Sequence, residues 1–186
     1  LKNQKVIGID SFDKYYSSIL KKKRLNILKK NKNFKFLKID LKDFNKLKKN
    51  LKNYKINYII HLAAQPGVRV SLTNPYNTLN QNLVSFSSII EISRIKKVKK
   101  FIYASSSSIY GDTKLYPFNE RDYKNSPISV YGATKLSNEI IAQSYVKNFK
   151  LSCVGLRFFT VYGPYGRPDM AYYSFLDNLR KRKKIT

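Results

Sequence analysis

Short apolar runs that alternate with helical patterns constrain this chain more than any other feature of its sequence. Strands are predicted where apolar residues crowd together, and apolar residues at helical spacing fill the segments between them. The predicted strands span residues 6–9, 34–39, 56–64, 99–104 and 152–161. Strands that alternate with helices are typical of a parallel sheet joined by right-handed crossovers. The sequence therefore predicts an α/β fold with a doubly wound parallel sheet.

Small and polar residues collect at the carboxyl ends of these predicted strands. Ligands of doubly wound sheets bind outside those ends, so the residues there predict a nucleotide site. Asp10 suits the carboxylate that accepts hydrogen bonds from an adenosine ribose, although a turn aspartate is an equally good interpretation. The residues at the predicted strand ends are Asp10, Asp40, Ala63, Ala64, the serine cluster 105–108, Phe159 and Thr160.

A tyrosine and a lysine four residues apart open the helical pattern that follows the serine cluster. Tyr131 and Lys135 lie on one face of the predicted helix. An ammonium group beside the ring oxygen favours phenolate, so Tyr131 can act as a base well below its ordinary pKa of about 10. This spacing alone is weak evidence. Together with hydroxyl groups where the preceding strand ends, it predicts a catalytic centre within residues 105–135.

Composition argues against several other kinds of site. One cysteine, Cys153, excludes an internal disulfide and a cysteine-based zinc cluster, and its apolar surroundings favour a buried structural thiol. The single histidine, His61, has no cysteine or carboxylate at ligand spacing, so we expect a structural role and no metal site. No apolar stretch approaches the roughly 20 residues that span a membrane, and no signal peptide is visible. The length of 186 residues predicts about one domain. We expect this protein to be located in the cytoplasm.

The formal charge of +26 has two interpretations. A polyanion partner is one, because nucleic-acid binders are often as basic as a pI near 10.1 implies. Compositional drift is the other, because 29 lysines outnumber 8 arginines, and lysine, asparagine, isoleucine and tyrosine share AT-rich codons. Arginine makes the bidentate phosphate contacts, so its scarcity favours drift. We expect weak, non-specific polyanion binding at most and no specific nucleic-acid partner.

Four stretches of the chain carry a resemblance to a known family. They resemble the extended short-chain dehydrogenase/reductase family of NAD-dependent epimerases and dehydratases, and within it most closely the UDP-glucuronate 4-epimerases. The resemblance covers nearly the whole chain and implies a Rossmann-type fold that binds NAD and a nucleotide sugar. The four stretches are residues 61–69 (HLAAQPGVR), 103–111 (YASSSSIYG), 131–135 (YGATK) and 156–170 (LRFFTVYGPYGRPDM).

The resemblance implies a catalytic role for three residues. Tyr131 would be the base, Lys135 would support it and hold the nicotinamide ribose, and Ser106 would bind the reacting oxygen of the sugar. The implied reaction removes the proton of the C4 hydroxyl and passes hydride from C4 to NAD. The 4-keto sugar then turns over and takes hydride back on its other face.

The resemblance also implies further contacts to the cofactor and the substrate. Asp10 would bind the adenosine ribose and Asp40 the adenine, and Thr160 would contact the sugar carboxylate. The implied cofactor contacts are Asp10, Asp40, Leu41, Leu62, Ala63, Ala64, Asn82, Tyr131 and Lys135. The implied substrate contacts are Ser106, Ser107, Ser108, Thr160, Arg167 and Arg69.

One position helps to choose among the reactions of the family. The related 4,6-dehydratases and decarboxylases carry a glutamate two residues before the tyrosine of the serine motif, where this chain has Ser108. Dehydration needs an acid/base group, and a serine hydroxyl serves poorly. Ser108 therefore favours simple epimerisation. The resemblance implies that UDP-glucuronate and UDP-galacturonate are the sugars interconverted. A UDP-glucose 4-epimerase, another epimerase/dehydratase, and a basic RNA-binding relative without catalysis stay open as alternatives.

The chain lacks one family motif, the glycine-rich turn after the first strand that cradles the pyrophosphate. We therefore expect residues 1–186 to be an N-terminally truncated part of the NAD-binding domain, with a gap in the middle of its sheet. The substrate-binding region would start at about 160, with most of the C-terminal substrate domain absent. We expect this span alone to be inactive and poorly folded, and the full-length protein to be a homodimer.

Overall fold

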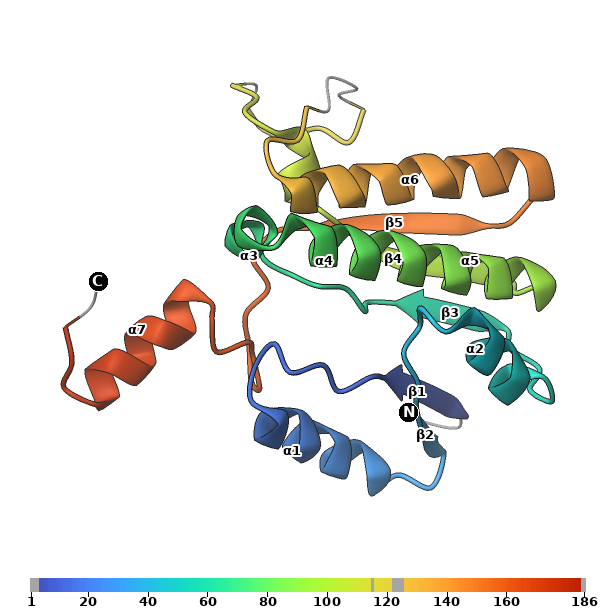
Figure 1. Cartoon of the computed structure of the whole chain (residues 1–186), viewed down its shortest axis with the longest axis horizontal. Coiled ribbons are helices and arrows are strands. Elements are labelled where there is room, and N and C mark those ends of the chain that lie inside the picture. Colours follow the sequence, from blue (N-terminus) through green and yellow to red (C-terminus); the bar gives the residue numbers. More distant parts are fainter. Residues whose placement is uncertain (1–3, 115, 122–125, 185–186) are drawn as a thin grey trace. The chain divides into compact units, whose positions relative to one another are not determined.

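A computed structural model describes residues 4–114, 116–121 and 126–184 of the chain (Figure 1). The chain divides into two compact units, the first made of Leu1–Lys38 with Thr160–Thr186 and the second of Ile39–Phe159. Each unit holds one parallel sheet, with the strand order β1-β2 in the first and β3-β4-β5 in the second.

The first unit is a strand–helix–strand crossover with a C-terminal helix. Its elements are β1 (Val6–Asp10), α1 (Ser18–Lys29), β2 (Phe34–Lys38) and α7 (Ala171–Arg180). The two strands are parallel, with Val6 opposite Phe34 and Asp10 opposite Lys38. Arg24 of α1 holds the loop before α7, because its guanidinium donates to the carbonyl oxygens of Tyr165 and, at 3.2 Å, Gly166.

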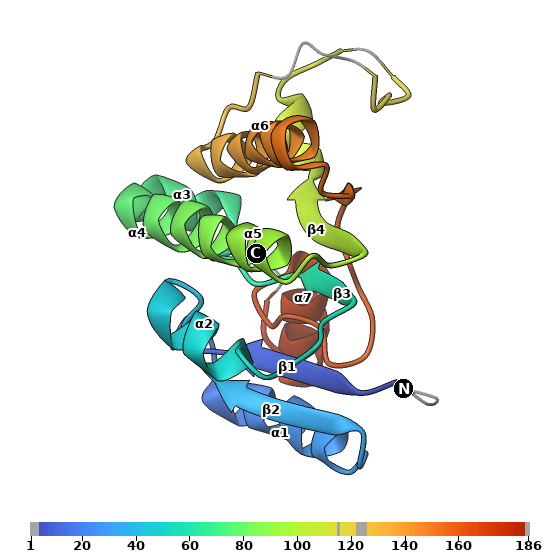
Figure 2. The same cartoon turned by 90° about the vertical axis from the view of Figure 1, so that its right-hand side faces the viewer.

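The second unit is a three-stranded sheet covered by helices. Its elements are α2 (Phe44–Leu51), β3 (Tyr58–His61), α3 (Val68–Thr73), α4 (Pro75–Leu79), the π-helical turn η1 (Asn80–Val84), α5 (Ser85–Ile95), β4 (Lys100–Ser106), the 3₁₀ turn η2 (Ser107–Tyr110), α6 (Val130–Phe149) and β5 (Cys153–Phe158). Helix α5 contacts β3, and α6 contacts β4 and β5, so both helices lie on one face of this sheet (Figures 1 and 2).

Aromatic rings fill the space between this sheet and its helices. The Phe86 ring of α5 lies 5.7 Å from the ring of Phe101 and 5.2 Å from that of Tyr103. His61 packs 5.7 Å from Phe86, as expected for a structural histidine. Burial, with a smaller contribution from the charge of Lys135, lowers the pKa of His61 to about 3, so its ring is neutral. Cys153 is half-buried, and burial raises its pKa to about 11.

Parallel pairing throughout confirms the predicted α/β class. The described strands form two sheets in place of one continuous sheet, in agreement with the expected interruption. Among the described helices, none combines the length and the apolar character that a membrane crossing requires.

Several element boundaries differ from the predicted ones. Strand β3 is shorter than the predicted 56–64. Apolar residues at helical spacing also predict one helix over residues 75–95, which the π-helical turn η1 interrupts. Residues 65–69 (QPGVR) predict a loop, yet helix α3 starts at Val68, because Gly67 takes a positive φ of 105° and lets a helix start directly after the Pro66–Gly67 pair. Proline and glycine there indicated a loop, but they form a helix start.

Candidate active site

The serine cluster lies where β4 passes into the turn η2. Ser105 and Ser106 end the strand, two residues beyond the predicted end at residue 104, and Ser106 is only 7% exposed. The Ser106 hydroxyl caps η2, because its Oγ accepts from the backbone N–H of Ser108 at 3.1 Å. It also lies 3.1 Å from the Ser108 Oγ, to which it donates. The two hydroxyls are therefore held at the carboxyl end of the middle strand.

The N-terminus of α6 packs directly against this turn. Ser129 caps the helix by accepting from the N–H of Gly132 at 3.0 Å. A Cβ atom at Gly132 would lie 2.8 Å from the carbonyl oxygen of Ser108 and 2.9 Å from the Cβ of Pro127. Only glycine permits this approach. The two motifs that the sequence analysis linked are thus in contact through Ser108 and Gly132.

Lys135 joins the first turns of α6 to the end of β4. Its side chain is buried, and its Nζ donates to the carbonyl oxygen of Ala104 at 2.8 Å. The same Nζ lies 5.8 Å from the ring centroid of Tyr131. Burial lowers the pKa of Lys135 to about 8, so the ammonium form still prevails at neutral pH. Tyr131 therefore has a cation near its ring, and the effect of this cation on the phenol oxygen stays a prediction.

Asn82 lies inside the protein, within the π-helical turn. Its Oδ1 accepts from the N–H of Gln65 at 2.7 Å. Its Nδ2 donates to the carbonyl oxygen of Gln65 at 3.2 Å and to the Thr134 hydroxyl at 3.1 Å. The amide of this implied cofactor contact thus ties the segment after β3 to α6, beside Lys135. A direct contact of Asn82 with a cofactor stays a prediction.

The other implied contacts of the second unit lie near strand ends. Asp40 accepts from the backbone N–H of Lys42 at 2.9 Å and pairs with its ammonium at 3.7 Å. Leu41 is buried. Residues with an exposed or half-buried position are Leu62, Ala63 and Ala64 after β3, Arg69 on α3, and Ser107 in η2.

Three residues with implied cofactor or substrate contacts belong to the first unit, namely Asp10, Thr160 and Arg167. Asp10 and Thr160 are exposed. Asp10 accepts from the backbone N–H of Phe12 at 2.6 Å. Arg167 is paired, since its Nε lies 3.0 Å from the Oδ1 of Asp169. Although burial raises it, hydrogen bonds from Arg167 and Tyr15 bring the pKa of Asp169 below its ordinary value.

A largely buried ion pair that was not predicted from the sequence begins one helical turn beyond Lys135. Glu139 of α6 meets Arg157 of β5 in two hydrogen bonds, Nε to Oε1 at 3.1 Å and Nη2 to Oε2 at 2.9 Å. The Ser105 hydroxyl donates to the same carboxylate. One signal was present, because Glu139 follows Lys135 by four residues and so shares its helix face. Its partner on a distant strand gave no local signal.

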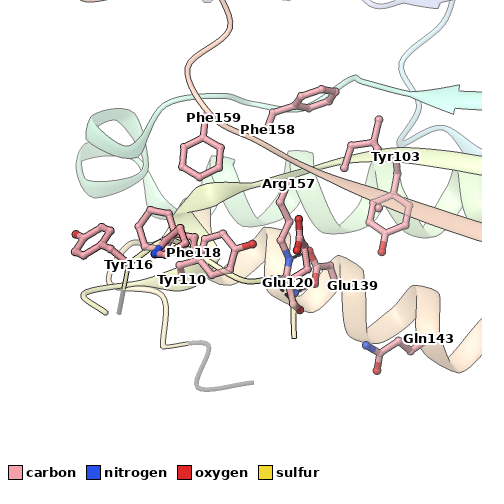
Figure 3. A pocket seen from close by; sticks show the side chains of 13 residues that line it. Tyr103, Tyr110, Tyr116, Phe118, Glu120, Glu139, Gln143, Arg157, Phe158 and Phe159 are labelled. Carbon is pink, nitrogen blue, oxygen red and sulfur yellow. Dashed lines mark hydrogen bonds and ion pairs between the residues drawn. The ribbon is translucent and has the colours of Figure 1, made fainter. Parts of the chain in front are cut away.

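A cavity of about 780 Å³ opens beside this pair (Figure 3). Aromatic side chains of β4, η2 and the following loop form much of its wall, and Gly155 and Leu156 of β5 contribute the rest of one side. Ser106, Tyr131 and Lys135 are not among its lining residues. The cavity therefore lies apart from the three implied catalytic side chains. Within the described ranges, no group of three His, Cys, Asp or Glu side chains could hold a metal ion.

The geometry combines a base, a cation and a hydroxyl on adjoining elements. Tyr131 and Lys135 stand on consecutive turns of α6, and Ser106 ends the strand against which that helix packs. Such a set can remove a proton from an alcohol and hold the oxygen as charge develops. The fold and the site therefore define a parallel α/β protein in which a tyrosine and a lysine on one helix lie beside a serine cluster at a strand end.

Comparison with known proteins places the chain in one family. Residues 1–186 match the NAD dependent epimerase/dehydratase family, and the chain belongs to it. It is 46% identical to Protein CapI of Staphylococcus aureus over 91% of this chain and 51% of that protein. It is 41% identical to UDP-glucuronate 4-epimerase 4 of Arabidopsis thaliana over 97% of this chain and 41% of that protein.

A solved structure agrees with these relatives. The crystal structure of UDP-glucuronic acid 4-epimerase from Bacillus cereus, in complex with UDP-glucuronic acid and NAD, superposes with a TM-score of 0.86. The identity is 36%, and the match covers 97% of this chain and 56% of that chain. The chain spans about half the length of the curated relatives it matches.

Proposed function

We propose that the whole protein is an NAD-dependent nucleotide-sugar 4-epimerase that interconverts UDP-glucuronate and UDP-galacturonate. Membership of the family and relatives that are UDP-glucuronate 4-epimerases support this proposal. The observation that carries it is the buried ammonium of Lys135, fixed on the Ala104 carbonyl and 5.8 Å from the Tyr131 ring.

The described residues fit a nicotinamide cofactor in two respects. An ammonium group has three N–H donors, and the Ala104 carbonyl uses one of those of Lys135, so donors are left for ribose hydroxyls. Ala63 and Ala64 after β3 are small and partly exposed, which suits close approach of a ligand to the backbone. When bound, NAD supplies the reversible acceptor for hydride from C4 of the sugar.

Three side chains then serve the sugar. Tyr131 accepts the proton of the C4 hydroxyl, and Lys135 stabilises the phenolate that this requires. Ser106 donates to the C4 oxygen; its hydroxyl has one donor, which must leave the Ser108 Oγ for this purpose, while the Ser108 N–H can keep one of its two acceptor sites. On the return step Tyr131 gives the proton back to the same oxygen.

Ser108 supports epimerisation over dehydration. The Ser108 Oγ accepts a hydrogen bond from the Ser106 hydroxyl at 3.1 Å, so Ser108 is held beside the side chain that binds the C4 oxygen. A serine there offers no carboxylate to remove a C5 proton. Within the epimerases, an enzyme for a neutral sugar such as UDP-glucose is the second candidate, and the substrate assay below separates the two.

Replacing Tyr131 tests the proposed function. In the intact protein supplied with NAD, we expect UDP-glucuronate to convert to UDP-galacturonate, followed by proton NMR of the anomeric signals. Tyr131→Phe removes the proton acceptor and should lower kcat by about 10²–10⁴-fold. Tyr145→Phe, on the same helix but bonded to Glu91 at 3.1 Å, is the control and should keep wild-type activity.

Two outcomes would contradict the proposal. Turnover of UDP-glucose with none of UDP-glucuronate would transfer the assignment to the second candidate. Equal activity of Tyr131→Phe and wild type would remove the tyrosine from the mechanism.

We also infer from the resemblance that the full-length protein forms a homodimer and works in the cytoplasm. Sedimentation equilibrium of the intact protein would give twice the monomer mass. Fractionation of cells would recover the protein with the cytoplasmic enzymes. A monomer in the first measurement, or recovery with membranes in the second, would contradict the respective inference.

A further inference from the structure

The ion pair of Glu139 and Arg157 connects the elements that carry the proposed catalytic groups. We propose that Glu139 is a positioning residue, which holds α6 in register on β4 and so sets Tyr131 and Lys135 against Ser106. This inference rests on the proposed function and adds a residue to it.

Helix α6 is bonded to β4 at two consecutive strand residues. Lys135 donates to the carbonyl oxygen of Ala104 at 2.8 Å, and one turn further on Glu139 accepts from the hydroxyl of Ser105. Two such bonds fix both the rotation of the helix and its position along the strand. The next strand residue is Ser106, whose hydroxyl faces the reacting oxygen in the proposed mechanism.

Arg157 fixes the orientation of the Glu139 carboxylate. Its planar guanidinium meets both oxygens of Glu139, and such a paired geometry defines position more strictly than a single bond. The guanidinium also lies 5.0 Å from the Tyr110 ring of η2 and donates to the carbonyl oxygen of Glu120 at 3.3 Å. Figure 3 shows the Arg157 side chain extending toward Glu139 among the residues that line the cavity.

The burial of the pair gives it a large effect on geometry. The Arg157 and Glu139 side chains are 15% and 11% exposed, whereas the similar pair Arg94 and Glu91 is 40% and 27% exposed. Loss of one partner leaves a buried charge without compensation, so the neighbouring backbone must shift or admit water. Both oxygens of Glu139 are occupied by protein groups, so its role is to position other residues and not to transfer protons.

The test compares Glu139→Gln with Glu91→Gln in the intact protein with NAD. Glu91 is a matched control, since it too bonds an arginine twice, at 2.9 and 2.6 Å, and a hydroxyl of a second residue. Misplacement of a reacting group by about 1 Å costs roughly 100-fold in rate. We expect Glu139→Gln to lower kcat by about 10- to 100-fold with KM changed less than about threefold, and Glu91→Gln to match wild type.

A pH profile separates positioning from mere loss of stability. If α6 moves on β4, the Lys135 ammonium loses its anchor on the Ala104 carbonyl and is no longer held beside the Tyr131 ring, so the apparent pKa of the base in the kcat profile should rise. The double variant Glu139→Gln with Arg157→Gln removes both buried charges. We expect it to recover thermal stability relative to the single variants but not kcat. Recovery of both would show a structural role only and would overturn the proposal.

Hydrogen exchange tests the positioning without any turnover. Peptides that cover residues 129–136 should exchange faster in Glu139→Gln than in Glu91→Gln. Unchanged exchange together with a wild-type kcat and pH profile would refute the role of Glu139 and leave the epimerase assignment intact. If the wild type turned over no nucleotide sugar, the proposed function would fail, and the exchange result would still decide whether Glu139 holds α6.

Discussion

His61 illustrates how burial governs a single side chain. The residue is 5% exposed, and its ring packs against Phe86 and Phe101. Burial and, to a smaller extent, the charge of Lys135 lower its pKa. A proton on this ring would be buried among aromatic rings and near the positive charge of Lys135. The folded state therefore excludes the proton that the unfolded chain accepts near pH 6.5.

Stability should fall on acidification because of this residue. Below its ordinary pKa the unfolded chain binds a proton and the folded protein, with a His61 pKa of about 3, does not. The free energy of unfolding should therefore drop by about 2 kcal/mol between pH 7 and pH 5. Urea denaturation of wild type and His61→Phe at both pH values measures this. The chain has one histidine, so an equal drop in the variant would contradict the assignment.

The residues that the sequence revealed are those with a local signal. Tyr131 and Lys135 were found by their spacing, and the structure places them on one helix face beside the serine cluster. The contacts of Asn82 with Gln65 and Thr134 span 17 and 52 residues, and the Glu139–Arg157 pair joins a helix to a distant strand. No periodicity encodes such contacts, because they arise from tertiary packing.

At the scale of elements, the site depends on how closely α6 approaches η2. The helix start brings the residue after Tyr131 against the backbone of Ser108, and its cap Ser129 fixes where the first turn begins. Strand positions and most helix positions were predictable from apolar periodicity. The π-helical turn η1 was not, because a π turn and an α-helix share nearly the same apolar pattern.

Gly132→Ala should damage this contact. Alanine is favoured over glycine inside a helix by roughly 1 kcal/mol, but its Cβ would lie 2.8 Å from a backbone oxygen that cannot move away alone. The clash should dominate, costing about 1–3 kcal/mol in the free energy of unfolding and at least tenfold in kcat. Ser137→Ala is the control, because its hydroxyl bonds only the Ala133 carbonyl of its own helix at 2.9 Å. A stabilised, active Gly132→Ala would contradict the close packing.

At the scale of the whole molecule, positive charge covers surfaces that the fold leaves free to vary. In α2 the lysines at 46, 48 and 49 are exposed while Leu47 is buried, and in α1 Lys22, Lys23 and Lys29 are exposed. This distribution supports compositional drift, since these lysines occupy exposed positions where core packing does not restrict the side chain. The charge of +26 was evident from the sequence, and the structure adds that these lysines of α1 and α2 are exposed.

Polyanion binding should accordingly be weak and sensitive to salt. Fluorescence anisotropy with a labelled single-stranded RNA should give a dissociation constant weaker than about 1 μM at physiological salt. Doubling the salt should abolish binding, because the affinity arises from released counterions. Nanomolar binding that persists at high salt, with no epimerase activity in the intact protein, would instead favour the RNA-binding alternative.

The bond from Lys135 to Ala104 separates what alkali does to the fold from what it does to the chemistry. A neutral amine still donates to a carbonyl, so the hydrogen bond between Lys135 of α6 and Ala104 of β4 remains after Lys135 loses its charge. Above a pKa of about 8 the folded protein has released a proton that the unfolded chain retains to about pH 10.5, so this residue favours folding more as pH rises. Tyr131 meanwhile loses its neighbouring cation. Alkaline inactivation of this centre would therefore be reversible, because the protein stays folded and loses only the positive charge beside the Tyr131 phenol.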